Sequence, residues 1–246
     1  MQIAEKKRFG LKTLSIILDD DAARAAVHDH RYARISVLSL NKLDLPGFRM
    51  IQSKETGLIE LHKNLDEIMA GFSSTARNEI RRTMTEDSPY TFRFSPHITR
   101  EAYDLYLDFE KQLHRVTFPF ATFNSCWEIA ALKGEAVVSV MWVYDSSPVA
   151  RVRHIFSIRH TDKTVSYANR RVMYEVVKHC KEQGCTAVDL AGIVPYSQDF
   201  KWSFHPTIVR DYAYVRSSLL YRMLERGIMM LRRFQQRNYK RRVIKS

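Results

Sequence analysis

Runs of aliphatic and β-branched residues predict β-strands in the first part of the chain. Residues 11–18, LKTLSIIL, and residues 33–40, ARISVLSL, have this composition, which is typical of strands. The pair Pro46-Gly47 follows the second run and predicts a turn. The N-terminal part of the chain is therefore expected to contribute strands to a sheet.

Apolar residues in the next region recur at spacings of three and four, the period of an amphipathic helix. This region opens at Asn64, and its apolar positions are Leu65, Ile68, Met69, Phe72, Ala76 and Ile80. Ser74 or Thr75 is the expected cap of a second helix within it. A short alternating strand, TFRF at 91–94, then precedes a second amphipathic helix over 98–115, for which Thr99 is the expected cap.

From residue 127 onward the pattern changes to short apolar runs separated by turns. Three such runs predict a strand meander over 127–158. A helix is predicted from about Ala168 to the stop at Gly184, and then a buried strand at 185–192. A short helix or turn at 199–204 and a strand at 207–217 follow.

This order of elements indicates an α/β (α+β) domain with a mixed sheet. Where strand ends meet a helix N-terminus, an anionic ligand commonly binds. In this chain the predicted place is the start of the helix near 168–171.

Composition narrows the class of protein. The 246 residues include only 8 Gly and 7 Pro, which argues against a disordered or linker-rich chain. No apolar run approaches the ~20 residues that span a bilayer, and the N-terminal segment does not resemble a signal peptide. The cysteines, Cys126, Cys180 and Cys185, lack a CxxC spacing and are expected to be free thiols. We therefore expect a cytoplasmic protein.

Positive charge is concentrated in the C-terminal tail. Residues 216–246 hold ten Lys and Arg residues and one acid, Glu225, so they carry +9 of the total +12. A long helix is predicted here, with an apolar stripe formed by Leu220, Met223, Leu224, Ile228, Leu231 and Phe234. Three interpretations stay open: the stripe docks on the body of the protein, the helix lies on an anionic membrane at the inner face of the plasma membrane, or the helix binds RNA.

Three segments together resemble a known family. These are NEIRR at 78–82, ANRRVMYEVVKHCKEQGCTAVDLAG at 168–192 and DFKWSF at 199–204. Their order and spacing resemble the FemAB-like branch of the GNAT acyltransferase superfamily, over roughly residues 60–215. That branch includes aminoacyl-tRNA-dependent transferases of peptidoglycan cross-bridges and acyltransferases of surface polysaccharide pathways.

The resemblance implies a fold and a division of the chain. The expected fold is a GNAT-like, mixed and mainly antiparallel sheet flanked by helices, with a basic C-terminal helix. The expected parts are a rudimentary α/β portion at 1–60, an acyltransferase domain at 61–215 and the basic helix at 216–246.

The resemblance also implies site residues. Lys201 matches the lysine of the family's FKxxF element, which lies near phosphates or the developing oxyanion. Asp189 matches the aspartate that ends the strand before the substrate loop, and we expect Asp189 or Asp199 to act as the base or to anchor the substrate amine. The remaining candidates are Asn169, Arg170 and Arg171 for the donor, and Arg77, Arg81, Arg82, Phe200 and Tyr196 for the substrate.

The sequence departs from the family pattern in three respects. His205 stands where the family usually has glycine after FKxxF, and the segment SYANRR before the helix contains no glycine. The chain also has room for one GNAT-like half and a rudimentary first part, whereas cross-bridge transferases have two halves. The segment without glycine argues against ordinary acetyl-CoA, whereas the single GNAT-like half argues against aminoacyl-tRNA. Of the two donors, acyl-CoA is the favoured one.

The expected function is transfer of an acyl or aminoacyl group to an amine of a cell-envelope glycan or peptidoglycan precursor. An anionic, lipid- or nucleotide-linked glycan is the expected substrate. The alternatives are an aminoacyl-tRNA-dependent transferase and a non-catalytic protein that binds RNA or another polyanion. No metal is expected, because His28-Asp29-His30 lacks a third ligand at a helpful spacing.

Overall fold

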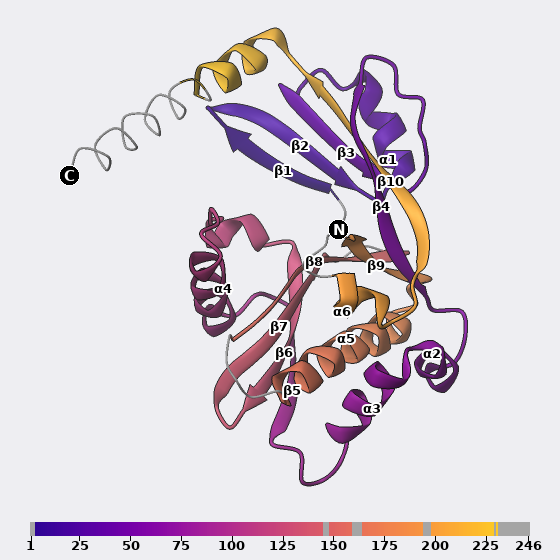
Figure 1. Cartoon of the computed structure of the whole chain (residues 1–246). Helices are drawn as coiled ribbons and strands as arrows, with labels where there is room; N and C mark the ends of the chain where they lie inside the picture. Colours follow the sequence, from indigo (N-terminus) through magenta and orange to yellow (C-terminus); the bar gives the residue numbers. More distant parts are fainter. Residues whose placement is uncertain (1–2, 145–147, 159–163, 194–197, 229, 231–246) are drawn as a thin grey trace, which may run out of the picture. The chain divides into compact units, whose positions relative to one another are not determined.

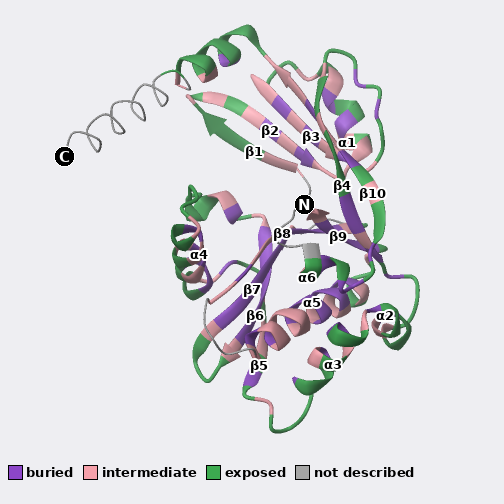
Figure 2. Ribbon diagram, viewed as in Figure 1, coloured by how far each residue is buried: buried purple, intermediate pink, exposed green. Residues whose placement is uncertain are grey.

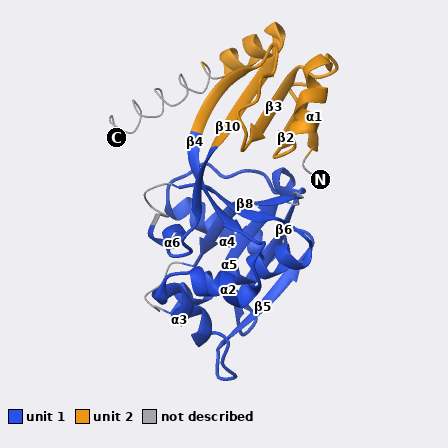
Figure 3. Ribbon diagram, turned by 90° about the vertical axis from the view of Figure 1, so that its right-hand side faces the viewer, with its two compact units in different colours: residues 1–2, 54–210 blue, residues 3–53, 211–246 orange. Residues whose placement is uncertain are grey.

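The computed structural model describes residues 3–144, 148–158, 164–193, 198–228 and 230 (Figure 1). The chain forms two compact units (Figure 3). The central unit comprises Met1–Gln2 and Lys54–Arg210, and the terminal unit comprises Ile3–Ser53 and Asp211–Ser246. The terminal unit thus combines residues 3–53 with the C-terminal part of the chain, whereas the sequence analysis placed its divisions at residues 60 and 215.

The sheet of the central unit contains the predicted meander. In spatial order its strands are β4 (Arg49–Glu60), β9 (Ala187–Gly192), β8 (Val149–Ser157), β7 (Ala136–Tyr144), β6 (Cys126–Lys133) and β5 (Tyr90–Ser95). Neighbouring strands in this list are antiparallel except β8 and β9, which pair in parallel. The prediction of a mixed, mainly antiparallel sheet is confirmed.

Helices cover both faces of this sheet (Figure 1). Successive side chains of a strand point to opposite faces, and the two core clusters of the unit follow this alternation. Ile129 and Met141 belong to the cluster that contains α5 (Thr164–Glu182). Their neighbours Ala130 and Trp142 belong to the cluster that contains α4 (Arg100–Gln112). The meander is therefore buried on both sides, as Figure 2 shows for β6 and β7.

Polar caps fix where the helices of the central unit begin. Asn64 and Glu67 form a reciprocal capping box at the start of α2 (Leu65–Gly71). Ser73 caps α3 (Ser74–Arg82), one residue before the predicted cap. Thr99 caps α4, as predicted, and the buried carboxylate of Glu128 accepts hydrogen bonds from the Thr99 amide and hydroxyl.

The terminal unit has a hydrophobic core of its own. Its strands lie in the order β1 (Ile3–Arg8), β2 (Leu11–Ile17), β3 (Arg34–Ser39) and β10 (Thr207–Ser217). The pair β2 and β3 is parallel, and the other two pairs are antiparallel. The core contains side chains of β2, β3 and β10, together with Ala23 of α1 (Asp20–Ala25). The sequence did not predict β1, α1 or β4.

The described residues contain no helix that combines the length and hydropathy needed to cross a membrane.

Candidate active site

A buried lysine is the central feature of the candidate site. Lys201 lies on the short helix α6 (Gln198–Trp202) and is only 6% exposed. Its Nζ donates a hydrogen bond to the carbonyl oxygen of Gly192 at 2.7 Å. The pKa of Lys201 is lowered from 10.5 to about 8, mainly by burial. The negative charge of Asp189 raises this pKa, and the positive charge of Arg151 lowers it.

A buried ion pair lies beside this lysine. Arg151 of β8 donates to one carboxylate oxygen of Asp189 on β9. The other oxygen accepts hydrogen bonds from the Thr56 hydroxyl and from the Ala191 amide, the latter at 2.8 Å. Asp189 is fully buried, and three donors occupy its oxygens. It is therefore placed to position the strand ends rather than to receive a substrate proton.

The ion pair marks the place where two parallel strands separate. The described pairing of β8 with β9 runs from Val149 and Ala187 to Arg151 and Asp189. Beyond this point β8 continues beside β7 as far as Ser157, whereas β9 pairs with β4. The register of β4 and β9 shifts between Thr56 and Leu58, and Ala191 has a φ of 59°. Ligands commonly bind where neighbouring strands of a sheet part.

Close packing holds the residue before β10 against β4. A Cβ on Gly57 would lie 2.8 Å from the Cβ of Pro206, the residue before β10. Glycine at this position is thus required by the close approach of the two segments. The short connection from α6 to β10 therefore lies directly against β4 at Gly57.

The FKxxF element packs through its aromatic rings. Phe204 is buried between Phe72 and Phe200, with ring centroids 5.0 and 5.2 Å away. His205 follows with a φ of 44°, the left-handed conformation that favours glycine. Its Nδ1 lies 2.9 Å from the Gly71 carbonyl oxygen. The position at which the sequence has histidine in place of the usual glycine therefore has a left-handed backbone.

The arginines of α3 have separate surroundings. Arg77 donates to the carbonyl oxygens of Ala70 and Phe72, and so satisfies the C-terminal end of α2. Arg82 donates to the Tyr167 hydroxyl at 2.8 Å, and Arg81 is exposed. Arg77 thus has a structural partner, and the structure does not gather the three guanidinium groups into one site.

The predicted donor residues lie inside α5 rather than at its start. The chain is already helical at Thr164, so the backbone amides of 169–171 are beyond the first turn, where helical carbonyls accept them. This corrects the prediction that the helix begins near Ala168 and that these amides cradle a donor.

The side chains of these residues have partners within the central unit. Asn169 bonds Ser139 and Ser157, and Arg171 pairs with Glu175 on its own helix. Of the three predicted donor residues, Arg170 contacts α6, the helix that carries Lys201. It pairs with Glu79 of α3 and lies 6.0 Å from the centroid of the Phe200 ring.

Of the two remaining candidates, the structure describes Asp199. Asp199 is exposed on α6, two residues from the inward-facing Lys201, and belongs to another face of that helix. Tyr196 lies outside the described residues.

Sequence reasoning missed Arg151 and Thr56. Arg151 is one of two arginines in the strand VARVRHIFS, and a charge in a strand that is expected to be buried is a signal of a buried pair. Thr56 had no such signal, because β4 itself was not recognised.

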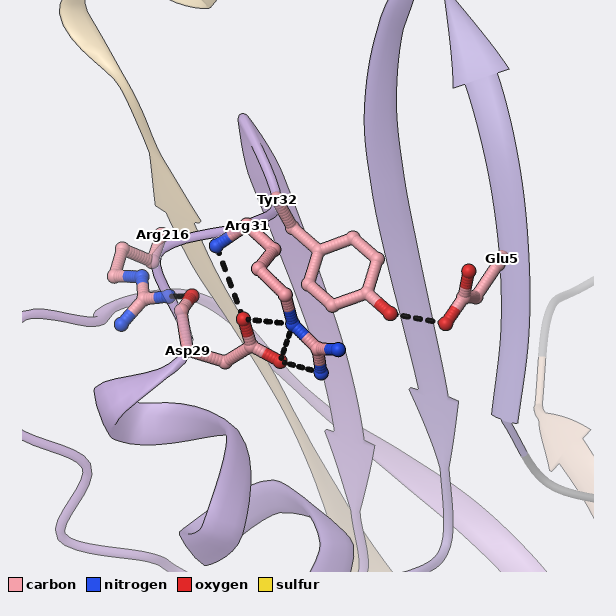
Figure 4. Close-up of polar contacts among 5 residues, drawn as sticks. All are labelled: Glu5, Asp29, Arg31, Tyr32 and Arg216. Carbon is pink, nitrogen blue, oxygen red and sulfur yellow. Dashed lines mark hydrogen bonds and ion pairs between the residues drawn. The ribbon is translucent and has the colours of Figure 1, made fainter.

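Two further titratable side chains have surroundings that explain their charge state, Asp29 in the segment His28-Asp29-His30 and His154 on β8. The Asp29 carboxylate accepts hydrogen bonds from the backbone and guanidinium of Arg31, which lower the pKa of Asp29 to about 2 (Figure 4). Among the described residues no cluster of His, Cys, Asp and Glu has the arrangement of a metal site. Burial lowers the pKa of His154 to about 3, so this ring is neutral near pH 7.

No protein-family model and no curated protein matches the sequence. Solved structures do match its fold. FemX has a TM-score of 0.61 at 12% identity, over 91% of this chain and 86% of FemX. The C-terminal DUF2156 domain of an Agrobacterium fabrum protein assigned as a lysylphosphatidylglycerol synthetase has a TM-score of 0.53 at 12% identity, over 88% and 81%. L-PGS from Bacillus licheniformis has a TM-score of 0.51 at 15% identity, over 96% and 86%. The chain therefore has the fold of FemX, and the FemAB-like resemblance of the sequence is confirmed at the level of fold.

Proposed function

We propose that the protein is an acyltransferase that transfers an acyl or aminoacyl group to an amine of a cell-envelope glycan or peptidoglycan precursor. The observation that carries this proposal is the buried Lys201 at the point where β8 and β9 part. The FemX-like fold supports it, because this is the fold that the sequence resemblance implied. An anionic, lipid- or nucleotide-linked glycan is the proposed acceptor.

The chemistry needs a positive group near the donor carbonyl. The neutral amine attacks the carbonyl carbon, a C–N bond forms, and negative charge develops on the carbonyl oxygen. The C–S or C–O bond to the leaving group then breaks, while the attacking nitrogen loses a proton that the departing thiolate or alkoxide can take up. A preorganised donor at the oxyanion lowers the barrier most when water is excluded.

Lys201 fits the role of that donor. One of the three N–H groups of its ammonium is engaged by the Gly192 carbonyl, which leaves two for an oxyanion or a phosphate. With a pKa of about 8 the amine is mostly charged at pH 7. Arg151 and Asp189 hold the strand that supplies the Gly192 carbonyl, so in this proposal they orient Lys201 without touching substrate.

Two donors are candidates. Acyl-CoA is the donor expected from the sequence, because the chain was expected to hold one GNAT-like half and only a rudimentary first part. The terminal unit bears on that argument, because it has four strands and its own buried core. The fold match to FemX also extends over 91% of the chain. These observations favour aminoacyl-tRNA as the second candidate donor.

Calorimetric titration of the full chain with acetyl-CoA and with aminoacyl-tRNA tests the proposal. We expect saturable binding of one of the two near one site per chain, weakened in Lys201→Met. Lys63→Met is the matched control, because Lys63 is an exposed lysine of the same unit. Binding of neither donor, or equal binding by Lys201→Met and the control, contradicts the proposal. Tight binding of tRNA that carries no amino acid, with no preference for the aminoacylated form, supports the polyanion-binding alternative instead.

A further inference from the structure

The helix that follows β10 is fastened to the terminal unit by one face. Residues 219–228 are helical. Tyr221 is fully buried, with its ring 5.7 Å from that of Phe9. One turn later, Glu225 accepts hydrogen bonds from Arg34 at 3.0 and 3.2 Å and pairs with Arg8. This face is held by a ring contact and an ion-pair cluster.

The same helix has a group of exposed large apolar side chains, which includes three members of the predicted stripe, Leu220, Met223 and Leu224. Leu219, Leu220 and Met223 are 67%, 56% and 63% exposed. Leu224 is also exposed, and so is Met230. Of the other members of the predicted stripe, Ile228 is half-buried, and Leu231 and Phe234 lie outside the described residues. An exposed group of large apolar side chains marks an interaction surface.

An arginine-lined cavity of about 590 Å³ lies in the terminal unit and shares this helix. Its charged lining residues are Arg34, Arg49, Arg216, Arg222, Glu225 and Arg226. Five arginines thus face one carboxylate, and the cavity carries a positive net charge. Ile51, which is half exposed, also lines it.

Two of these arginines already have hydrogen-bond or ion-pair partners within the terminal unit. Arg34 binds Glu225. Arg216 donates to the carbonyl oxygens of Val27 and Asp29 and lies over the ring of Phe48 (Figure 4 shows the bond to Asp29). Arg49, Arg222 and Arg226 are exposed and have no side-chain partner among the described residues. These three guanidinium groups are available to an anion.

We infer that this helix and cavity form a docking surface for an anionic lipid bilayer. Leu219, Leu220 and Met223 enter the boundary between headgroups and acyl chains, and the cavity receives a headgroup phosphate through Arg222, Arg226 and Arg49. An amphipathic helix with basic residues beside an apolar face has the chemistry that such surfaces bind. The inference concerns the terminal unit and stands independently of the proposed transferase activity.

The observations favour a bilayer over the other occupants. Single-stranded RNA is held by basic grooves with aromatic side chains for base stacking, whereas the exposed apolar side chains of this helix are Leu and Met. A symmetric contact between two copies would bring the same arginines together. An anionic bilayer complements both the charge and the apolar face.

Co-sedimentation of the full chain with vesicles tests the inference. One set contains phosphatidylcholine alone, and the other contains phosphatidylcholine and phosphatidylglycerol in equal parts. We expect binding to the second set only. Residues 231–246 contain seven further Lys and Arg residues that attract any polyanion, so the decisive variant leaves the charge unchanged.

That variant is Leu220→Gln with Met223→Gln. Both side chains are exposed, and the substitution removes apolar surface, so we expect roughly tenfold weaker binding or more. Arg222→Gln with Arg226→Gln should weaken binding by roughly fivefold for each arginine. The matched control is Arg24→Gln with Lys42→Gln, which removes the same charge from exposed positions elsewhere in the terminal unit.

Three results would overturn the inference. The first is undiminished vesicle binding by Leu220→Gln with Met223→Gln, which would make the tail a general polyanion binder. The second is an equal loss in the control. The third is release of the protein from vesicles by inorganic phosphate or by an RNA hairpin at the same phosphate concentration as the lipid.

Discussion

Replacement of Lys201 by methionine should change how stability depends on pH. Below pH 8 the amine is protonated in both the folded and the unfolded chain, and the folded state bears the full cost of the buried cation. Between pH 8 and 10.5 the unfolded chain retains a proton that the folded chain has released, so the free energy of unfolding rises with pH. Above 10.5 both states are neutral.

The size of this effect follows from the lowered pKa of Lys201. A fall from 10.5 to about 8 corresponds to about 3 kcal/mol, at about 1.36 kcal/mol for each pH unit. Methionine has a similar length and no charge, so Lys201→Met lacks this contribution. The stability of the parent relative to the variant should therefore increase by about 3 kcal/mol from pH 8 to 10.5.

Urea unfolding of both proteins at a series of pH values measures the difference. Tyrosines, cysteines and other lysines titrate in the same range, but they are common to both proteins and cancel in the comparison. Lys63→Met serves as the control and should parallel the parent. Parallel pH profiles for the parent and Lys201→Met would show that Lys201 titrates as in water, and would refute the argument that burial tunes this amine.

Three further substitutions test the surroundings of the site, all by urea unfolding near pH 7. Arg151→Met leaves the fully buried Asp189 without its cation and should cost about 3–5 kcal/mol; a loss below 1 kcal/mol would contradict the buried pair. Gly57→Ala places a Cβ 2.8 Å from that of Pro206 and should cost about 1–3 kcal/mol, so an unchanged midpoint would speak against this close approach. His205→Ala should be about 1 kcal/mol less stable than His205→Gly, because both lack the imidazole and only glycine adopts a φ of 44° without strain; equal stabilities would exclude the left-handed conformation.

Much of the central unit could be predicted because its elements bury regular patterns. The meander over 127–158 and the helix capped by Thr99 follow directly from apolar runs and a capping residue. The strand β4 could not, because most of its first half is exposed on both faces and so shows no alternation. The strand β1 is likewise largely polar and exposed, IAEKKR.

The candidate site was predicted in part. Lys201 and Asp189 were singled out, and the structure places both in one buried group. Their partners, Arg151 and Thr56, come from strands far away in the sequence, and their roles depend on strand register that composition does not encode. The start of α5 was misplaced because its first turn, TVSY, has no strong capping signal.

The orientation of the C-terminal helix also depended on tertiary structure. Its apolar periodicity predicts an amphipathic helix, but periodicity alone does not say which face is covered. The ion pairs of Glu225 and the burial of Tyr221 orient the helix, and they turn Leu220 and Met223 outward.

Transfer of a labelled acyl group is the measurement that tests the central claim most directly. The full chain is incubated with a UDP-linked peptidoglycan precursor that has a free amine, and with radiolabelled acetyl-CoA or radiolabelled aminoacyl-tRNA. The account predicts a labelled, amide-linked product from one of the donors, lost in Lys201→Met and retained in Lys63→Met. Equal product from Lys201→Met and Lys63→Met, or binding of a donor without transfer to any amine, would contradict it.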